Sequence, residues 1–215
     1  MNKGVEGLPP TFPIFPLSGC LLLPGGNLPL NIFEPRYLKM VRDAMQTERV
    51  IGMIQPKGGE DMQGRPVLFD TGCAGRIDNF KETDDGRCLI TLTGVCRFDI
   101  ENELDTTTPY RKVAADFSGW LNDFSPEPPP DDLRSGLLRE LMIYFETQGI
   151  EVEWDALEAA PMPGLITSLA MICPFHSNEK QALLQARTLT EQAKLLETLL
   201  QMANLESMNP SQRMN

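Results

Sequence analysis

The first half of the chain alternates apolar and polar residues with the period of two that is typical of β-strands. The alternation is clearest over 87–101 and predicts a strand with one buried face. Its apolar face holds Cys88, Ile90, Leu92, Cys96, Phe98 and Ile100. Its polar face holds Thr91, Thr93, Arg97 and Asp99. The segment 67–80 is the expected partner strand, because Asp84, Asp85 and Gly86 favour a tight turn between the two.

Shorter apolar runs predict the other strands of this half. Prolines interrupt the runs within 12–33, which confines them to sheet edges or strand starts. The runs 50–55 and 113–121 predict a buried strand and the last strand. One helix is expected among them, over 35–46, because Pro35 suits the first helical position. The residues that would face the core from this helix are Leu38, Val41 and Met45.

The second half changes to a helical period. A helix is predicted over 132–148, with Asp131 or Asp132 as its cap and Gly149 beyond its end. Three shorter helices, bounded by prolines, are expected over 154–160, 163–173 and 178–186. Thr188 and Glu191 match a capping box and open a last helix to about residue 205.

The two halves meet at 122–130, which has four prolines in nine residues and cannot carry a helix. We therefore expect a β-rich lobe over 1–121 and a proline-rich linker over 122–130. A helical lobe over 131–207 and a frayed tail over 208–215 would follow. Many antiparallel strands with one helix suggest that the first lobe is a small, partly closed barrel.

Charge and cysteine content narrow the functional class. The formal net charge of −11 argues against nucleic acid and anionic membranes as partners. The five cysteines are odd in number and form no CxxC pair, which favours a reducing compartment and thus the cytoplasm. The chain has no apolar run of 18 residues and no signal-peptide pattern, so neither a transmembrane helix nor secretion is expected.

Motifs for catalysis are missing from the sequence. The dipeptide Gly-Lys of a P-loop does not occur, and neither does G-x-S-x-G. The single histidine, His176, lies between two predicted helices without nearby Cys or carboxylate ligands, so we interpret it as structural or solvated. No catalytic residue, metal site or cofactor is therefore expected.

Several motifs resemble the N-terminal substrate-binding domain of Lon proteases. In stand-alone members of that family an apolar strand ends in I-F-E-P-R-Y at a helix start, which here spans 32–37. The family's G-x-x-R-F ending matches Gly94 to Phe98, and a looser motif matches Gly75 to Ile77. In the helical half, the letters LITSLAMICPFHSNEKQALLQ are also similar to the family. The resemblance covers roughly 11–203.

This resemblance implies an α+β fold, with an N-terminal PUA-like β pseudo-barrel lobe followed by a C-terminal helical bundle lobe. It also implies non-catalytic recognition of polypeptides, because the match ends before the ATPase and protease parts of full-length Lon. The expected partners are unfolded or exposed apolar polypeptide segments, together with a protease or another proteostasis component. Weak self-association stays open.

The candidate binding residues that the motif supplies are Phe33, Glu34, Arg36 and Tyr37. The favoured interpretation is structural: Glu34 and Arg36 pair, Tyr37 packs beneath them, and Arg36→Ala lowers stability. The other interpretation is binding, because Arg and Tyr are enriched at interaction hot spots. Phe33 is expected to be buried, so that Phe33→Ala costs about 3–5 kcal/mol.

Two other functions stay open at this point. PUA-like barrels elsewhere bind RNA, although the net charge of −11 argues against this function here. An unrecognised hydrolase, or a protein associated with a peptidase by family name only, is the second alternative. A peptidase assay on the purified protein separates the name from the activity.

Overall fold

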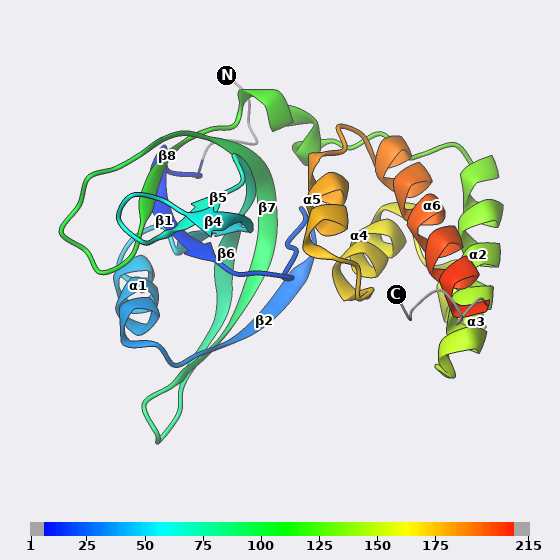
Figure 1. Cartoon of the computed structure of the whole chain (residues 1–215), viewed down its shortest axis with the longest axis horizontal. Helices are drawn as coiled ribbons and strands as arrows, with labels where there is room; N and C mark the ends of the chain where they lie inside the picture. Colours follow the sequence, from blue (N-terminus) through cyan, green and yellow to red (C-terminus); the bar gives the residue numbers. More distant parts are fainter. Residues whose placement is uncertain (1–6, 209–215) are drawn as a thin grey trace.

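The computed structural model describes residues 7–208 and has an α+β architecture in which most strands precede the helices (Figure 1). The strands are β1 (Thr11–Pro16), β2 (Asn27–Ile32), β3 (Val50–Ile54), β4 (Pro56–Glu60), β5 (Pro66–Leu68), β6 (Thr71–Glu82), β7 (Cys88–Glu103) and β8 (Lys112–Asp116). The helices are α1 (Pro35–Met45), α2 (Asp132–Gln148), α3 (Trp154–Ala159), α4 (Met162–Ile172), α5 (Ser177–Gln185) and α6 (Leu189–Met208), with a 3-10 helix η1 (Ser118–Phe124). The α+β class expected from the sequence is confirmed.

The main sheet closes on itself over most of its width. Its strand order is β2-β7-β6-β3-β1-β8, and β7 pairs with β8 as well. Only β1 and β3 run parallel, whereas the other neighbouring pairs are antiparallel. The β7–β8 pairing joins five strands into a ring, and β2 stays outside it as the border of the sheet (Figure 1).

The 16-residue strand β7 belongs to two substructures. Its second half, from Asp99 to Glu103, pairs with β8 inside the barrel. Its first half pairs with β2 on one side and with the distal part of β6 on the other. These three segments (27–32, 77–82 and 88–93) form a projection that we call the ribbon, and it ends in the predicted turn. That turn prediction is confirmed, with Gly86 at a φ of 82°.

Two apolar clusters hold the fold together. The smaller one fills the barrel and includes Phe12, Ile14, Phe98 and Trp120. The larger one unites residues of the sheet, among them Ile51 and Leu92, with helical residues, among them Leu137, Leu183 and Leu196. Because the strand-rich and helical parts share one core, their division at 122–130 stays a prediction.

The predicted helix bounds agree with the structure at most helix ends. Gly149 takes the left-handed conformation after α2, at φ 67°. The capping box opens α6, where the Glu191 N–H donates to Thr188 Oγ1 at 3.1 Å and the Thr188 N–H donates to Glu191 Oε2 at 3.3 Å. Within residues 7–208 no helix combines the length and the apolar character that crossing a membrane requires. Met208 ends α6, and the rest of the tail expected over 208–215 lies outside the described residues.

The predicted strand over 113–121 is wrong in its second half. The strand ends at Asp116, whose carboxylate accepts hydrogen bonds from the Ser118 N–H and hydroxyl, both at 2.8 Å. These local bonds turn the chain into η1, as aspartate often does at turns. The turn places Trp120 over the barrel, where its side chain is buried.

Candidate functional site

The motif over 32–37 connects β2 to α1 and exposes the residue that was expected to be buried. Ile32 lies opposite Cys88 in the sheet and is buried, whereas Phe33 is 64% exposed. The prediction that Phe33 is buried is therefore wrong. Successive residues of an extended chain point to opposite sides, so the burial of Ile32 turns Phe33 outward.

Glu34, Arg36 and Tyr37 lie together at the start of α1. Arg36 Nε and Nη2 are both 2.9 Å from Glu34 Oε2, and the Arg36 guanidinium carbon is 4.5 Å from the centre of the Tyr37 ring. Tyr37 is buried, with its ring 4.3 Å from that of Phe15. Arg36 and Glu34 are 53% and 44% exposed, and ion pairs at such exposure add little stability. The role of these residues in binding stays a prediction.

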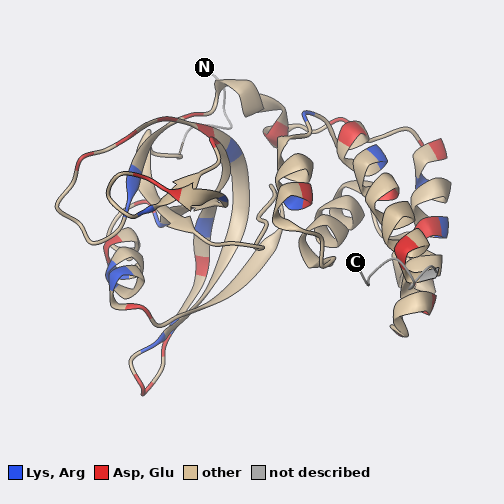
Figure 2. Cartoon of the chain, viewed as in Figure 1, with Lys and Arg blue, Asp and Glu red and all other residues tan. Residues whose placement is uncertain are grey.

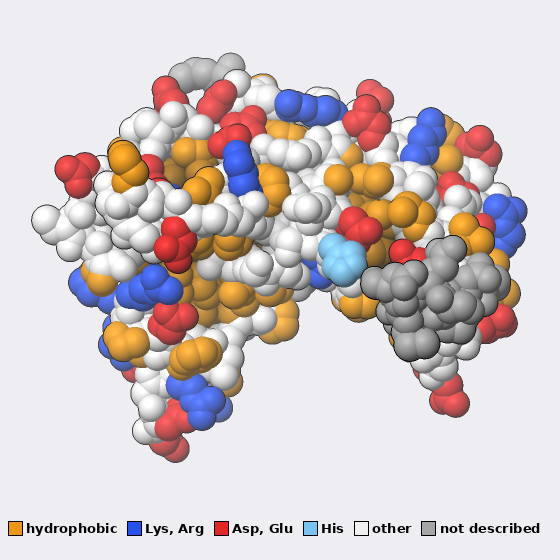
Figure 3. Space-filling view, viewed as in Figure 1, with side chains coloured by type: hydrophobic (Ala, Val, Ile, Leu, Met, Phe, Trp, Pro, Cys, Tyr) orange, Lys and Arg blue, Asp and Glu red, His pale blue; other side chains and the backbone are white. Residues whose placement is uncertain are grey.

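The ribbon carries further exposed apolar side chains. Leu89 and Phe80 are 42% and 38% exposed, and both line a shallow hollow of about 470 Å³ along the three strands. Pro29 and Leu30 of β2 line the same hollow, which we call the ribbon hollow. Figure 3 shows hydrophobic side chains gathered along the ribbon. Exposed apolar clusters of this kind are typical of interaction sites.

Sequence reasoning missed Phe80 and Leu89. A signal was present for Leu89, because it is an apolar residue on the otherwise polar face of the alternation over 87–101. The ribbon hollow holds one charged residue, Lys81, among the residues that line it. A binding surface with few charges and several apolar side chains suits apolar partners.

A second hollow lies where the strand-rich and helical parts meet. It has a volume of about 500 Å³, and its walls come from β7, η1, the segment 125–128, α4 and the start of α6. Arg97 and Asp123 form part of its wall, together with the exposed side of Arg187. We call it the junction cavity.

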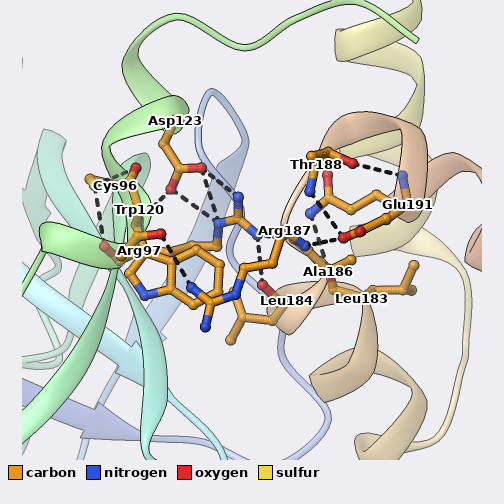
Figure 4. A network of polar contacts seen from close by, with 12 residues as sticks. Cys96, Arg97, Trp120, Asp123, Leu183, Leu184, Ala186, Arg187, Thr188 and Glu191 are labelled. Carbon is orange, nitrogen blue, oxygen red and sulfur yellow. Dashed lines mark hydrogen bonds and ion pairs between the residues drawn. The ribbon is translucent and has the colours of Figure 1, made fainter. Parts of the chain in front are cut away.

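Arg97 is the centre of the polar contacts at this junction (Figure 4). Its Nη2 lies 2.6 Å from Asp123 Oδ1, and its backbone N–H donates to Asp123 Oδ2 at 2.8 Å. Its Nη1 donates to the Leu184 carbonyl at 2.9 Å and also to the Ala186 carbonyl. The Trp120 ring centre is 4.2 Å from the Arg97 guanidinium carbon. Arg97 therefore ties β7 to η1 and to the turn between α5 and α6.

The burial of Arg97 differs from the polar, solvent-facing position that its place in the alternation indicated. The side chains of Arg97 and Asp123 are 6% and 4% exposed. Buried charges are tolerated when they are paired and hydrogen-bonded, and both conditions hold here. The arginine of the G-x-x-R-F motif thus has a structural task, which no pattern in the sequence indicated because its partner lies in η1.

Burial also governs the thiols near this junction. Burial, with a smaller contribution from the Asp123 carboxylate, raises the pKa of the Cys96 thiol to about 12. Burial raises the pKa of Cys173 to about 11, against a small opposing effect of Lys180. Such thiols stay protonated at neutral pH and are poor nucleophiles.

The described residues contain no group of three or more His, Cys, Asp or Glu side chains that could hold a metal ion. His176 is exposed at the start of α5, where its backbone N–H donates to Glu179 Oε2 at 2.7 Å. The arrangement around His176 is that of a helix start, with Glu179 closing the first turn.

Fold and surface define a class of α+β domain in which a barrel with a projecting apolar ribbon packs on a set of helices. The sequence over 11–202 matches the family model of the ATP-dependent protease La (LON) substrate-binding domain, and the chain belongs to this family. The resemblance expected from the I-F-E-P-R-Y and G-x-x-R-F motifs is thereby confirmed.

Known relatives agree with this assignment. The Lon protease of Parabacteroides distasonis is 35% identical over 51% of this chain and 13% of its own length. That of Anaeromyxobacter dehalogenans is 27% identical over 93% of this chain and 24% of its own length. The chain thus spans at most about a quarter of these relatives, so their full activity is not carried over.

Two solved structures share the fold. The Lon N-terminal domain protein from Xanthomonas campestris has a TM-score of 0.60 at 24% identity, over 89% of this chain and 97% of that one. The N-terminal domain of Mycobacterium avium complex Lon protease has a TM-score of 0.64 at 13% identity, over 89% and 98%. At these identities the likeness concerns the fold alone.

Proposed function

We propose that the chain is a polypeptide-recognition domain that has no catalytic activity of its own. The observation that carries this proposal is the exposure of Phe33, Phe80 and Leu89 on or beside the ribbon. Apolar side chains gain free energy when a partner covers them, so their exposure on or beside a projecting element favours a docking role. The matched family is described as a substrate-binding domain, which supports the same conclusion.

The proposed partners are unfolded or exposed apolar polypeptide segments. The ribbon hollow suits them because apolar residues and small polar residues line it, with Lys81 as its charged member. RNA fits this hollow poorly, because RNA binding depends on several cations and aromatic platforms. A protease or another proteostasis component is the proposed working partner, since the relatives carry this region within Lon proteases.

We also propose a cytoplasmic location. All five cysteines are free, and four of them are buried. Free thiols persist in reducing compartments, whereas secreted proteins tend to pair them.

A binding measurement tests the proposed function. The probe is a fluorescent, unstructured peptide rich in valine and leucine, and a glycine-serine peptide of equal length and charge is the control. We expect the apolar peptide to bind and Leu89→Asp to weaken its binding by about tenfold or more. Leu121→Asp is the matched control variant, because Leu121 is 36% exposed but lies on η1, away from the ribbon.

Two results would contradict the proposal. Equal affinity for both peptides, or unchanged affinity in Leu89→Asp, would show that the ribbon does not recognise apolar segments. ATP or peptide turnover that survives purification, and that a point substitution abolishes, would contradict the non-catalytic role.

A further inference from the structure

Within residues 7–208, the border strand β2 has one long edge without a neighbouring strand. On its other side β2 pairs with β7, and the Gly94 N–H donates to the Gly26 carbonyl at 2.8 Å. This hydrogen bond fixes which residues of β2 bond to β7. In antiparallel strands, residues that bond to a given neighbour alternate with residues that do not. Leu28 and Leu30 therefore direct their backbone groups toward β7, whereas Asn27, Pro29 and Asn31 direct theirs toward the open edge.

The position of Pro29 agrees with this alternation of bonded and unbonded residues. Proline has no N–H to donate, so it is found where a strand's N–H would face away from the ladder. The open edge then offers the N–H groups of Asn27 and Asn31 and the carbonyls of Asn27, Pro29 and Asn31. Among the described residues, no backbone hydrogen bond to these five groups occurs from outside the strands. The side chains of the three residues are exposed.

The opposite border of the ribbon is protected, which makes the open edge of β2 distinctive. The distal part of β6 carries Asp78, Lys81 and Glu82, and Arg42 of α1 pairs with Glu82 at 3.1 Å. Charged side chains are a common protection of sheet edges against strand addition. β2 has no charged residue, as Figure 2 shows, and its edge is limited by Pro29 alone.

We propose that β2 binds an extended segment of the partner polypeptide as an added strand, an inference that rests on the proposed function. Main-chain hydrogen bonds would supply affinity that is independent of sequence, as a domain that meets many unfolded chains requires. The partner side chains on the inner face would lie beside Leu28 and Leu30, which are half-buried and apolar. Those on the outer face would lie between Asn27 and Asn31. Figure 3 shows an open notch between the ribbon and the helical part, and β2 borders this notch in Figure 1.

A second copy of this chain fits the edge less well than a foreign segment does. Each copy carries a formal net charge of −11, so pairing two copies brings like charges together. In addition, each of the two β2 strands would contain Pro29 and would therefore lack one N–H donor at the shared edge. The favoured occupant is therefore an extended segment of another protein that is neutral or basic and alternates apolar with polar residues.

Backbone methylation of a peptide tests this geometry. The probe is a short peptide of alternating threonine and valine with a lysine at each end. In a strand added antiparallel to β2, valines beside Leu28 and Leu30 direct their amides away from β2, so the threonine amides pair with its edge. We expect N-methylation of the threonines to weaken binding by about tenfold or more, and N-methylation of the valines by about twofold or less.

Variants of Asn31 test the same edge from the protein side. Asn31→Pro removes the outward N–H without breaking the ladder to β7, so peptide affinity should fall while the thermal midpoint is kept. Asn31→Ala retains the N–H and should bind as the native protein does. If Asn31→Pro does not fold, the methylated peptides still decide.

Three outcomes would overturn edge pairing. If both methylated peptides bind equally and Leu89→Asp still abolishes binding, strand addition is wrong while the proposed function stands. If the native protein binds none of the peptides, both are wrong. If the native protein is a dimer that dissociates in Asn31→Pro, the edge belongs to a second copy.

Discussion

Arg97 of β7 and Asp123 of η1 form a buried ion pair, with 2.6 Å between Arg97 Nη2 and Asp123 Oδ1. Removing one charge leaves the other buried without its partner. Asp123→Asn is therefore expected to lower the free energy of unfolding by about 3–5 kcal/mol, as measured by urea denaturation. Asp85→Asn is the control, because Asp85 and Arg87 pair at 51% exposure each, and its loss should be much smaller than that of Asp123→Asn. Equal losses in the two variants would contradict the structural role of Arg97.

Phe33→Ala should leave stability nearly unchanged, because the side chain is 64% exposed. We expect a change within about 0.5 kcal/mol, whereas Phe98→Ala, at a fully buried position, should cost about 3–5 kcal/mol. Urea denaturation of both variants measures this difference. If Phe33 contributes to the binding surface, peptide affinity falls in Phe33→Ala, and unchanged affinity would remove Phe33 from that surface.

Arg36→Ala separates the two interpretations of the helix start. Because Arg36 and Glu34 are about half exposed, the variant should lose less than about 1 kcal/mol of stability. The exposure thus favours the binding interpretation over the stabilising one. A large drop in the urea midpoint with normal peptide affinity would restore the stabilising role, and the reverse result would support binding.

Gly94→Ala should destabilise the protein. A Cβ at Gly94 would lie 2.0 Å from the Leu23 carbonyl oxygen, and backbone cannot move away as a flexible side chain can. We expect a loss of about 1–3 kcal/mol in urea denaturation. Gly164→Ala is the control, because a Cβ there meets nothing within 4 Å and the helix gains propensity. Equal stability of the two variants would show that the loop containing Leu23 can move away from β7 without cost.

Stability should decline in alkaline solution. Burial raises the pKa of Cys96 from 9.0 to about 12, so above pH 9 the unfolded chain releases a proton that the folded chain keeps. The unfolded state then binds fewer protons, and stability falls as pH rises through this window. Urea midpoints measured across it should fall less steeply in Cys96→Ala than in the native protein. The same slope in both would exclude Cys96 as a contributor.

Periodicity in the sequence predicted the elements well, since it depends on local chemistry. The alternation over 87–101, the turn at Gly86 and the capping box at Thr188 each have a physical signal within a few residues. The strand expected to reach residue 121 failed because the side chain of Asp116 competes for the backbone of Ser118. Local polar competition of this kind overrides an apolar run.

The candidate site was less accessible to sequence reasoning. Phe33 was expected to be buried because it is apolar. Its place directly after the buried Ile32, at the end of the alternation of β2, turns it toward solvent instead. The register of β6 with β7 places Phe80 opposite Ile90 and Lys81 opposite Leu89, and periodicity along one strand does not reveal this pairing. Arg97 finds Asp123 across a turn that the sequence did not reveal. Each of these relationships depends on register or on long-range contacts, which hydrophobic periodicity does not encode.

The barrel limits when its strands can pair during synthesis, which starts at the N-terminus. Phe12 of β1 pairs with Val113 of β8, so the ring can close only after β8 has left the ribosome. At typical rates of about 5–20 residues per second, β1 waits on the order of 5–20 seconds for this neighbour. During that interval its free edge and the aromatic side chain of Phe12 are open to other nascent chains. A domain that we propose to receive unfolded polypeptides therefore itself passes through a period in which it resembles one.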